Sequence, residues 1–152
     1  MVYFWMIIAV CIDQAAKFVV KNYMELGETI PLIQGIFHLT SHRNPGAAWG
    51  IMAGQRWLLI TIAIVVVAAG SIYAKKITNR MQQFGLGLFL GGALGNVVDR
   101  VFYGEVVDFF DIRFINYPIF NTADTAIVIG GVILAVTSWK EDKLKRTTRE
   151  IE

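Results

Sequence analysis

The stretch Asn96–Asp124, NVVDRVFYGEVVDFFDIRFINYPIFNTAD, joins two long apolar segments of the chain. One apolar segment ends near its start, another begins near its end, and a short polar connection lies between them. If both segments cross a membrane, the connection lies on one side, and the carboxylates of Asp108 and Asp124 lie at the same membrane face. We interpret the rest of the chain as the frame that holds these two acids.

The composition is that of a membrane protein. Of the 152 residues, 55% are hydrophobic and 17% are charged, and the mean hydropathy is +0.53. Soluble domains are about 45–50% apolar and roughly 25% charged. The net charge of +2 is too small to indicate nucleic acid as a partner. The single cysteine excludes an intramolecular disulfide and a multi-cysteine metal site.

The apolar residues are gathered into four blocks, which predict an all-α membrane protein with four transmembrane helices. A helix needs about 20 residues to cross the hydrocarbon of a bilayer. No Lys or Arg precedes Lys17 and no small-residue cleavage pattern follows, so the first block is expected to be a retained span. We expect one membrane domain over 1–152, with spans at about 1–23, 57–74, 81–98 and 118–139.

The segment 24–56 is too polar and too interrupted to be a span. Pro31, Gly35 and the run Asn44–Gly46 indicate turns, and Ile36–Ser41 has the composition of a strand. We therefore predict a small β-unit outside the membrane. The acids in 105–112 are surrounded by bulky β-formers, so this part of the connection is either a short strand or an interfacial turn.

Two charged residues lie inside the first span, which is costly unless they face protein or water. Asp13 and Lys17 are four residues apart and share a helical face. Two interpretations stay open. Either the pair is a polar support on the active-site side of the bundle, or it is an ion pair at the membrane boundary, with Lys17 and Lys21 snorkelling.

The third span carries small and polar residues in rows four apart. A glycine stripe at positions 87, 91 and 95 is expected to let another helix approach closely. Gly92, Asn96 and Arg100 form a neighbouring row that resembles the wall of a site, although snorkelling stays open for Arg100.

Asn121 and Asp124 share a face near the start of the fourth span, where either suits a helix N-cap. Because a helix has one N-cap, capping is not expected to account for both.

The basic residues predict the orientation. Three Lys or Arg lie in 75–80 and five lie in the tail 140–152, so both are predicted to be cytoplasmic. With four spans, the N-terminus is then cytoplasmic too. The segments 24–56 and 101–117, together with both acids, are expected on the extracytoplasmic side.

Two adjacent carboxylates suit acid–base chemistry. Like charge raises one pKa strongly, so such a pair shares one proton. One member can take a proton from water while the other hydrogen-bonds a scissile carbonyl. A metal site would need more ligands than Asp99, Asp108, Asp111 and Asp124 supply without a histidine. Two alternatives stay open at this point: a four-helix proton-coupled transporter, and a scaffold whose polar residues only hold helices together.

Five separated motifs lie along the chain: DQAAK at 13–17, NPGAAWG at 44–50, GALGNVVDR at 92–100, VVDF at 106–109 and FNTAD at 120–124. Together these motifs resemble those of the lipoprotein signal peptidases, the signal peptidase II family of bacterial membrane aspartic proteases. Their order, spacing and placement agree over nearly the whole chain, and Pro45 is the one unusual position within them.

The resemblance implies that Asp108 and Asp124 are the catalytic dyad. It also implies that further motif residues support the site or contact substrate: Asp13, Lys17, Asn44, Gly46, Gly92, Asn96, Arg100 and Asn121. The family's substrate is a diacylglyceryl-modified prolipoprotein, cleaved just before the lipidated cysteine to release the signal peptide. The family lies in the bacterial cell membrane, uses no metal or organic cofactor and is the target of the antibiotic globomycin. The implied partners are the prolipoprotein and membrane lipids. Nothing in the sequence demands more than a monomer.

Overall fold

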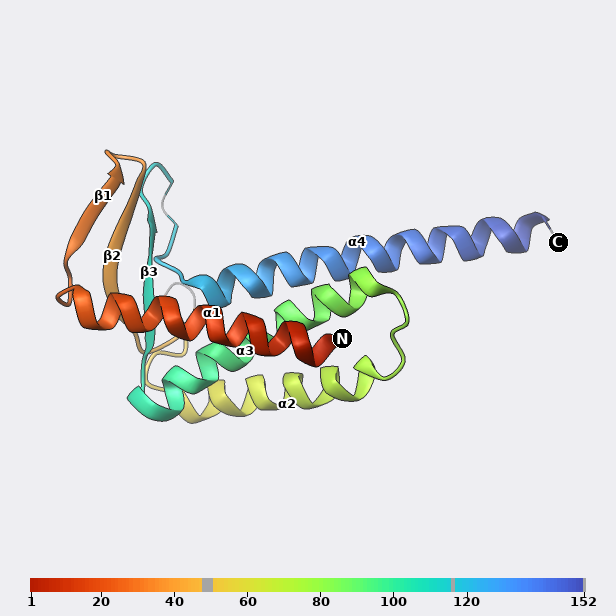
Figure 1. The fold of residues 1–152 in the computed structure, drawn as a ribbon, viewed down its shortest axis with the longest axis horizontal. Coiled ribbons are helices and arrows are strands. Elements are labelled where there is room, and N and C mark those ends of the chain that lie inside the picture. The colour runs from red at the N-terminus through yellow and green to blue at the C-terminus, as the bar shows by residue number, and fades with distance from the viewer. Residues whose placement is uncertain (48–50, 116, 152) are drawn as a thin grey trace.

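The computed structural model describes residues 1–47, 51–115 and 117–151, which form a helical bundle with a small sheet at one end (Figure 1). The helices are α1 (Val2–Tyr23), α2 (Arg56–Ala74), α3 (Arg80–Tyr103) and α4 (Thr122–Ile151). The strands are β1 (Thr29–Ile33), β2 (Phe37–Asn44) and β3 (Val106–Ile112). Each helix includes a stretch long and apolar enough to cross a membrane. The predicted fold class, four such helices with a small β-unit, is confirmed.

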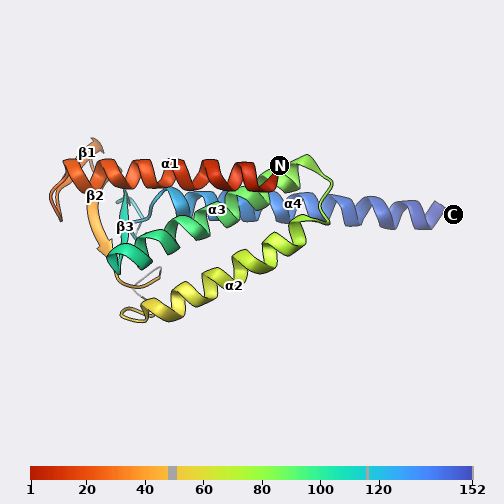
Figure 2. The same ribbon diagram turned by 60° about the horizontal axis from the view of Figure 1, so that its bottom comes forward.

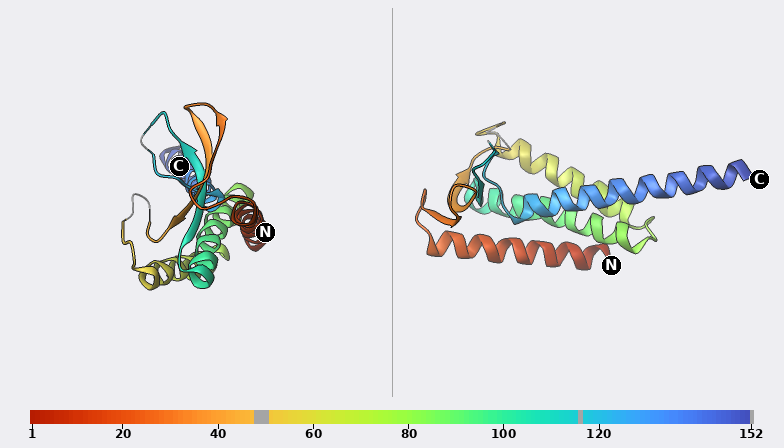
Figure 3. Two further views of the ribbon diagram at one scale, coloured as in Figure 1. Left: turned by 90° about the vertical axis from the view of Figure 1, so that its left-hand side faces the viewer. Right: turned by 90° about the horizontal axis from the view of Figure 1, so that it is seen from above.

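Two helices differ from the predicted spans at their ends. α3 runs on to Tyr103 and stops at Gly104, whose φ of 86° is a left-handed conformation that favours glycine. α4 begins at Thr122, because Phe120 is still extended and bridges to Phe110 of β3. At its other end α4 continues through the charged tail to Ile151, well beyond the other helices (Figure 3).

The glycine stripe brings α1 against α3, as the sequence predicts. A Cβ on Gly87 would lie 2.8 Å from the Val2 carbonyl oxygen, and one on Gly91 would lie 2.7 Å from that of Met6. α3 lies at the centre of the bundle and packs against α1, α2 and α4 (Figure 2). By contrast, α2 buries Ile60 and leaves most of its apolar side chains exposed, which suits a helix surrounded by lipid.

The sheet is antiparallel, with the strands in the order β1-β2-β3. The segment 106–112, for which strand and turn stayed open, is therefore a strand. The turn predicted at Pro31 is wrong: Pro31 lies within β1 and pairs with His38. Since β1 is the edge strand, its outer side tolerates a residue without an N–H.

A β-bulge in β2 precedes the part of the sheet that carries Asp108. Leu39 pairs with Phe110 and His42 pairs with Asp108, so two residues of β2 oppose one of β3. Asn44 then pairs with Val106. Because alternate residues of a strand share a face, Asn44 and Asp108 lie diagonally on one side of the sheet.

The chain passes four times along the bundle, so its loops gather at two ends. The sheet, the start of α2 and the start of α4 lie at one end, and the α2–α3 loop lies at the other (Figure 1). The two acids of the motif stretch therefore share one end of the molecule.

Candidate active site

A cavity of about 210 Å³ lies where α3, α4 and β3 meet, at the sheet end of the bundle. Asp108 enters its wall from β3 and Asp124 from the first turn of α4. Asn44, Asn96 and Arg100 supply further polar groups. The remaining wall comes from residues of the α4 surface and of the connection before it: Tyr117, Pro118, Ile119, Phe120, Ile127 and Val128, with Ala47 and Val106.

Asp108 is 1% exposed and accepts a hydrogen bond on each carboxyl oxygen. Asn121 Nδ2 donates to Oδ1 at 2.6 Å, and Asn44 Nδ2 donates to Oδ2 at 2.9 Å. Burial raises the pKa of the Asp108 carboxyl to about 7, and the charge of Asp124 acts in the same direction against the two amide donors. Near neutral pH this carboxyl is therefore poised between its two protonation states.

Asp124 is the third residue of α4 and forms a reciprocal capping box with Asn121. The Asp124 N–H donates to Asn121 Oδ1 at 2.9 Å, and the Asn121 N–H donates to Asp124 Oδ2 at 3.3 Å. The expectation that capping could not account for both residues is wrong, because a capping box uses two side chains. Capping leaves Asp124 Oδ1 to accept from Asn96 Nδ2 at 2.8 Å.

Two amide side chains connect the two acids. Asn121 Nδ2, besides bonding Asp108, donates to Asn96 Oδ1 at 3.2 Å. Asn96 in turn donates to Asp124. The chain of contacts from Asp108 through Asn121 and Asn96 to Asp124 fixes the orientation of both carboxyl groups.

Arg100 holds the loop that follows β2. Its Nη2 donates to the Gly46 carbonyl at 2.6 Å, while the Gly46 N–H donates to Asn44 Oδ1 at 2.9 Å. The guanidinium therefore bonds protein at the cavity wall, which argues against simple snorkelling of Arg100. A Cβ on Gly46 would lie 2.7 Å from the Ile51 carbonyl oxygen, so this glycine permits a tight loop. Motif positions 48–50 lie outside the described residues.

Gly92 acts through helix packing, because a Cβ there would collide with the carbonyl oxygen of Ala123. It allows α3 to approach the first turn of α4, where Asp124 lies. Among the motif residues predicted to support the site, Gly92 is thus one that does not line the cavity.

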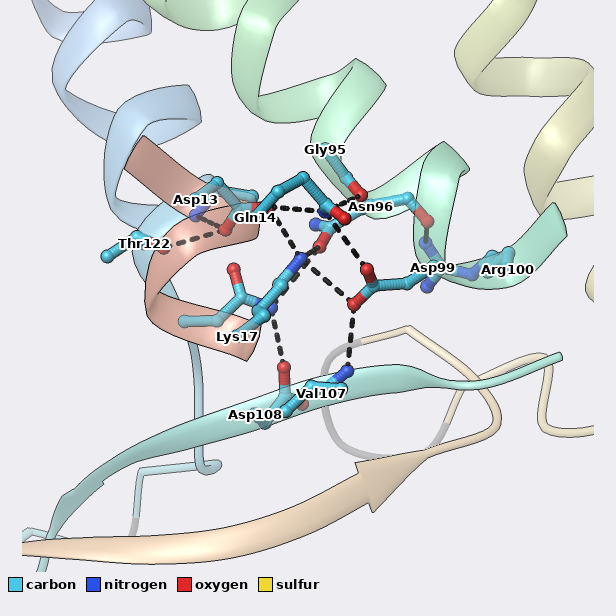
Figure 4. A network of polar contacts seen from close by, with 12 residues as sticks. Asp13, Gln14, Lys17, Gly95, Asn96, Asp99, Arg100, Val107, Asp108 and Thr122 are labelled. Carbon is cyan, nitrogen blue, oxygen red and sulfur yellow. Dashed lines mark hydrogen bonds and ion pairs between the residues drawn. The ribbon is translucent and has the colours of Figure 1, made fainter. Parts of the chain in front are cut away.

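Asp13 and Lys17 are buried, at 1% and 3% exposure, and pair at 2.8 Å (Figure 4). Their side chains face α3 and the start of α4, which favours the interpretation as a polar support inside the bundle. Lys17 does not snorkel. Lys21, one turn later, is exposed, with its ammonium 3.2 Å from the ring centre of Tyr103.

The sequence interpretation missed Asp99 and Gln14 as parts of this network. Asp99 pairs with Lys17 at 3.1 Å, and Gln14 Nε2 donates to Asp99 at 3.0 Å. Both residues lie within the motifs quoted above, and their place in those motifs was the sequence signal that could have identified them. The other acid considered as a metal ligand, Asp111, pairs with Arg113 on the sheet. Among the described residues, no three His, Cys, Asp or Glu side chains gather closely enough to hold a metal ion.

Comparison with known proteins places this geometry in a family. Residues 5–140 match the family model described as signal peptidase (SPase) II. The chain is 48% identical to the lipoprotein signal peptidase of Anoxybacillus flavithermus, over 91% of this chain and 85% of that protein. It is 49% identical to the lipoprotein signal peptidase of Geobacillus kaustophilus, over 90% and 92%.

Solved structures agree with the sequence matches. A bacterial membrane enzyme determined in meso at 2.3 Å resolution superposes with a TM-score of 0.88 and 34% identity, covering 95% of this chain and 90% of that one. A second, at 1.9 Å resolution, gives a TM-score of 0.81 and 35% identity, over 90% of each chain. The protein is therefore a multi-pass membrane peptidase that belongs to the signal peptidase II family.

Proposed function

We propose that this protein is an aspartic endopeptidase that removes the signal peptide from diacylglyceryl-modified prolipoproteins, cleaving just before the lipidated cysteine. The observation that carries the proposal is the presence of Asp108 and Asp124 in one cavity, joined by a scaffold of two asparagines. Membership of the signal peptidase II family supports the substrate class.

The dyad works by sharing one proton. With the pKa of Asp108 at about 7, a state with one proton on the pair is accessible at neutral pH. The ionised carboxylate takes a proton from a water molecule as its oxygen attacks the scissile carbonyl. The protonated partner hydrogen-bonds the carbonyl oxygen and later passes its proton to the leaving amine.

The surrounding groups suit a peptide with a lipid attached. Arg100 and Asn44 reach the cavity wall from two sides and are placed to bind carbonyl groups of the substrate. Val128 and Ile127 line the cavity from α4 and continue into that helix's apolar surface. This continuity allows acyl chains to remain in lipid while the peptide enters the cavity.

The orientation forms part of the proposal. The basic α2–α3 loop and the basic tail both lie at the end of the bundle away from the cavity. By the positive-inside tendency that end is cytoplasmic, so the termini are cytoplasmic and the cavity is at the extracytoplasmic face.

The test is a gel-shift assay on purified diacylglyceryl-modified prolipoprotein in detergent, with a metal chelator present. We expect wild type to cleave, and folded Asp108→Asn and Asp124→Asn to lose cleavage. Strong residual activity in either variant would refute the dyad. Failure of folded wild type to cleave would favour the proton-coupled transporter, and wild-type activity lost only with chelator would favour a metal-dependent hydrolase.

A further inference from the structure

Lys17 is the centre of a buried network behind the candidate dyad (Figure 4). Its ammonium has three hydrogens and three short contacts: Asp13 Oδ2 at 2.8 Å, Asp99 Oδ2 at 3.1 Å and Asn96 Oδ1 at 2.9 Å. Every donor of the side chain is therefore in use. Such a cation ties together the groups around it and has no hydrogen left for a substrate.

One of the two carboxylates, Asp13, holds the start of α4. Its Oδ1 accepts from the Ala123 N–H at 2.8 Å and from Thr122 Oγ1 at 2.7 Å. The first N–H groups of a helix lack partners within the helix, and a carboxylate there is favoured by the helix dipole. The contact fixes the residue immediately before Asp124.

The other carboxylate, Asp99, holds β3 in the corresponding way. Its Oδ2 accepts from the Val107 N–H at 3.0 Å, while the same oxygen contacts Lys17. Val107 immediately precedes Asp108. Each carboxylate beside Lys17 thus accepts a hydrogen bond from the backbone N–H of the residue just before one of the two candidate catalytic aspartates.

We infer that Asp13, Lys17 and Asp99 form a positioning bridge that sets the separation and orientation of Asp108 and Asp124. This inference rests on the proposed function, since it assigns a task to the bridge in that reaction. The bridge acts through the backbone, and Lys17 adds a second route through Asn96, which bonds the Asp124 side chain.

The location of the bridge fits positioning and not chemistry. Asp13, Lys17 and Asp99 do not line the cavity that contains the dyad. Lys17 and Asp99 instead border a separate hollow of about 190 Å³ between α1, α3 and β3. Removing a positioning group displaces reacting atoms, and a displacement of about 1 Å can lower the rate by roughly 10²-fold.

The first test is amide hydrogen exchange on ¹⁵N-labelled protein in micelles, comparing wild type with Lys17→Met. The control is Lys21→Met, because Lys21 is one turn along α1 and exposed. The two reporters are the amides of Val107 and Ala123. The Phe109 amide of β3, which donates to the Phe120 carbonyl at 3.0 Å, reports general loosening around β3.

Lys17→Met is expected to speed exchange at both reporters by about tenfold or more, corresponding to 1.4 kcal/mol of lost protection, with Phe109 unchanged. Lys17→Met removes an ammonium group that contacts neither the Val107 amide nor the Ala123 amide. Faster exchange at both amides would therefore show that Lys17 acts on them through Asp13 and Asp99. Unchanged exchange at both reporters in folded Lys17→Met would overturn the inference. If Lys17→Met does not fold, Asp99→Asn is measured instead. We then expect faster exchange at the Val107 amide and unchanged exchange at the Ala123 amide. Unchanged exchange at Val107 would overturn the inference.

The second test is kinetic, on the prolipoprotein substrate. A bridge predicts that Asp99→Asn lowers kcat by about 10–100-fold, leaves KM within about threefold and retains both limbs of the pH profile. Loss of one limb would make Asp99 a member of the reacting pair and overturn the inference. If the amides respond as expected but wild type cleaves no prolipoprotein, the bridge stands and the proposed function fails.

Discussion

Replacing Asp108 by asparagine should inactivate the protein and stabilise it at neutral pH. Burial raises the pKa of this carboxyl from 3.8 to about 7 in the folded state. Between these two pH values the folded protein binds more protons than the unfolded chain, so the free energy of unfolding falls as pH rises. Each pH unit in that window lowers the free energy of unfolding by up to 1.36 kcal/mol, so the wild type loses up to about 4 kcal/mol of stability between pH 4 and pH 7.

Asparagine removes this penalty because it carries no charge at any pH, but it introduces a hydrogen-bonding conflict. Asp108 accepts from the amide groups of both Asn44 and Asn121, whereas an asparagine side chain has one oxygen and one NH₂. One donor then faces another donor, at a cost of about 1–3 kcal/mol. The net stabilisation at pH 8 is therefore about 1–3 kcal/mol, and at pH 4 the variant is the less stable protein.

The measurement is the free energy of unfolding in mixed detergent micelles, from pH 4 to pH 8, for wild type and Asp108→Asn. His42→Asn is a suitable control, because His42 pairs with Asp108 across the sheet and its side chain is exposed. The stability difference between variant and wild type should grow in favour of the variant as pH rises. A constant difference would show that Asp108 titrates alike in the folded and unfolded states, and would refute the account of the raised pKa.

Three further substitutions test other parts of the site. Gly92→Ala should destabilise the protein by about 1–3 kcal/mol and lower its activity, because the added methyl group forces α3 away from α4. As a control, Gly131→Ala should leave the thermal melt nearly unchanged, since a Cβ there would lie 3.9 Å from its nearest neighbour. Asn44→Ala removes a donor that favours the ionised form of Asp108, so the acid limb of the pH–rate profile should move to higher pH. Arg100→Lys should raise KM by about tenfold with a smaller effect on kcat, since the ammonium cannot hold the loop and reach the cavity together.

The sequence predicted the fold well because its signals are local. Apolar blocks of spanning length, glycines four apart and a basic loop each act within one helix or one turn. The residue at which α4 begins, by contrast, depends on a contact between distant segments. Phe120, for example, stays extended because its backbone N–H bonds the Phe110 carbonyl at 3.1 Å, and no local pattern indicates that pairing.

The candidate site was harder to predict because its key contacts join residues that are far apart in the chain. Spacing indicated that Asp13 and Lys17 share a face, but not that the face meets Asp99 and the start of α4. The prediction for Asn121 and Asp124 failed for a different reason. Their spacing of three residues is that of a capping box, in which both side chains take part. The prediction instead treated Asn121 and Asp124 as alternative N-cap residues.

The capping box and the buried lysine together explain how a charged site is kept ordered at the sheet end of the helix bundle. Unpaired carboxylates would neutralise themselves or draw water into the bundle. Here Asp13 and Asp99 each accept from several donors that include Lys17, while Asp108 and Asp124 receive neutral amide donors. Structural acids are thus paired with a cation and candidate catalytic acids with amides. Amide donors orient a carboxyl group without fixing its charge, which leaves Asp108 free to exchange a proton near neutral pH.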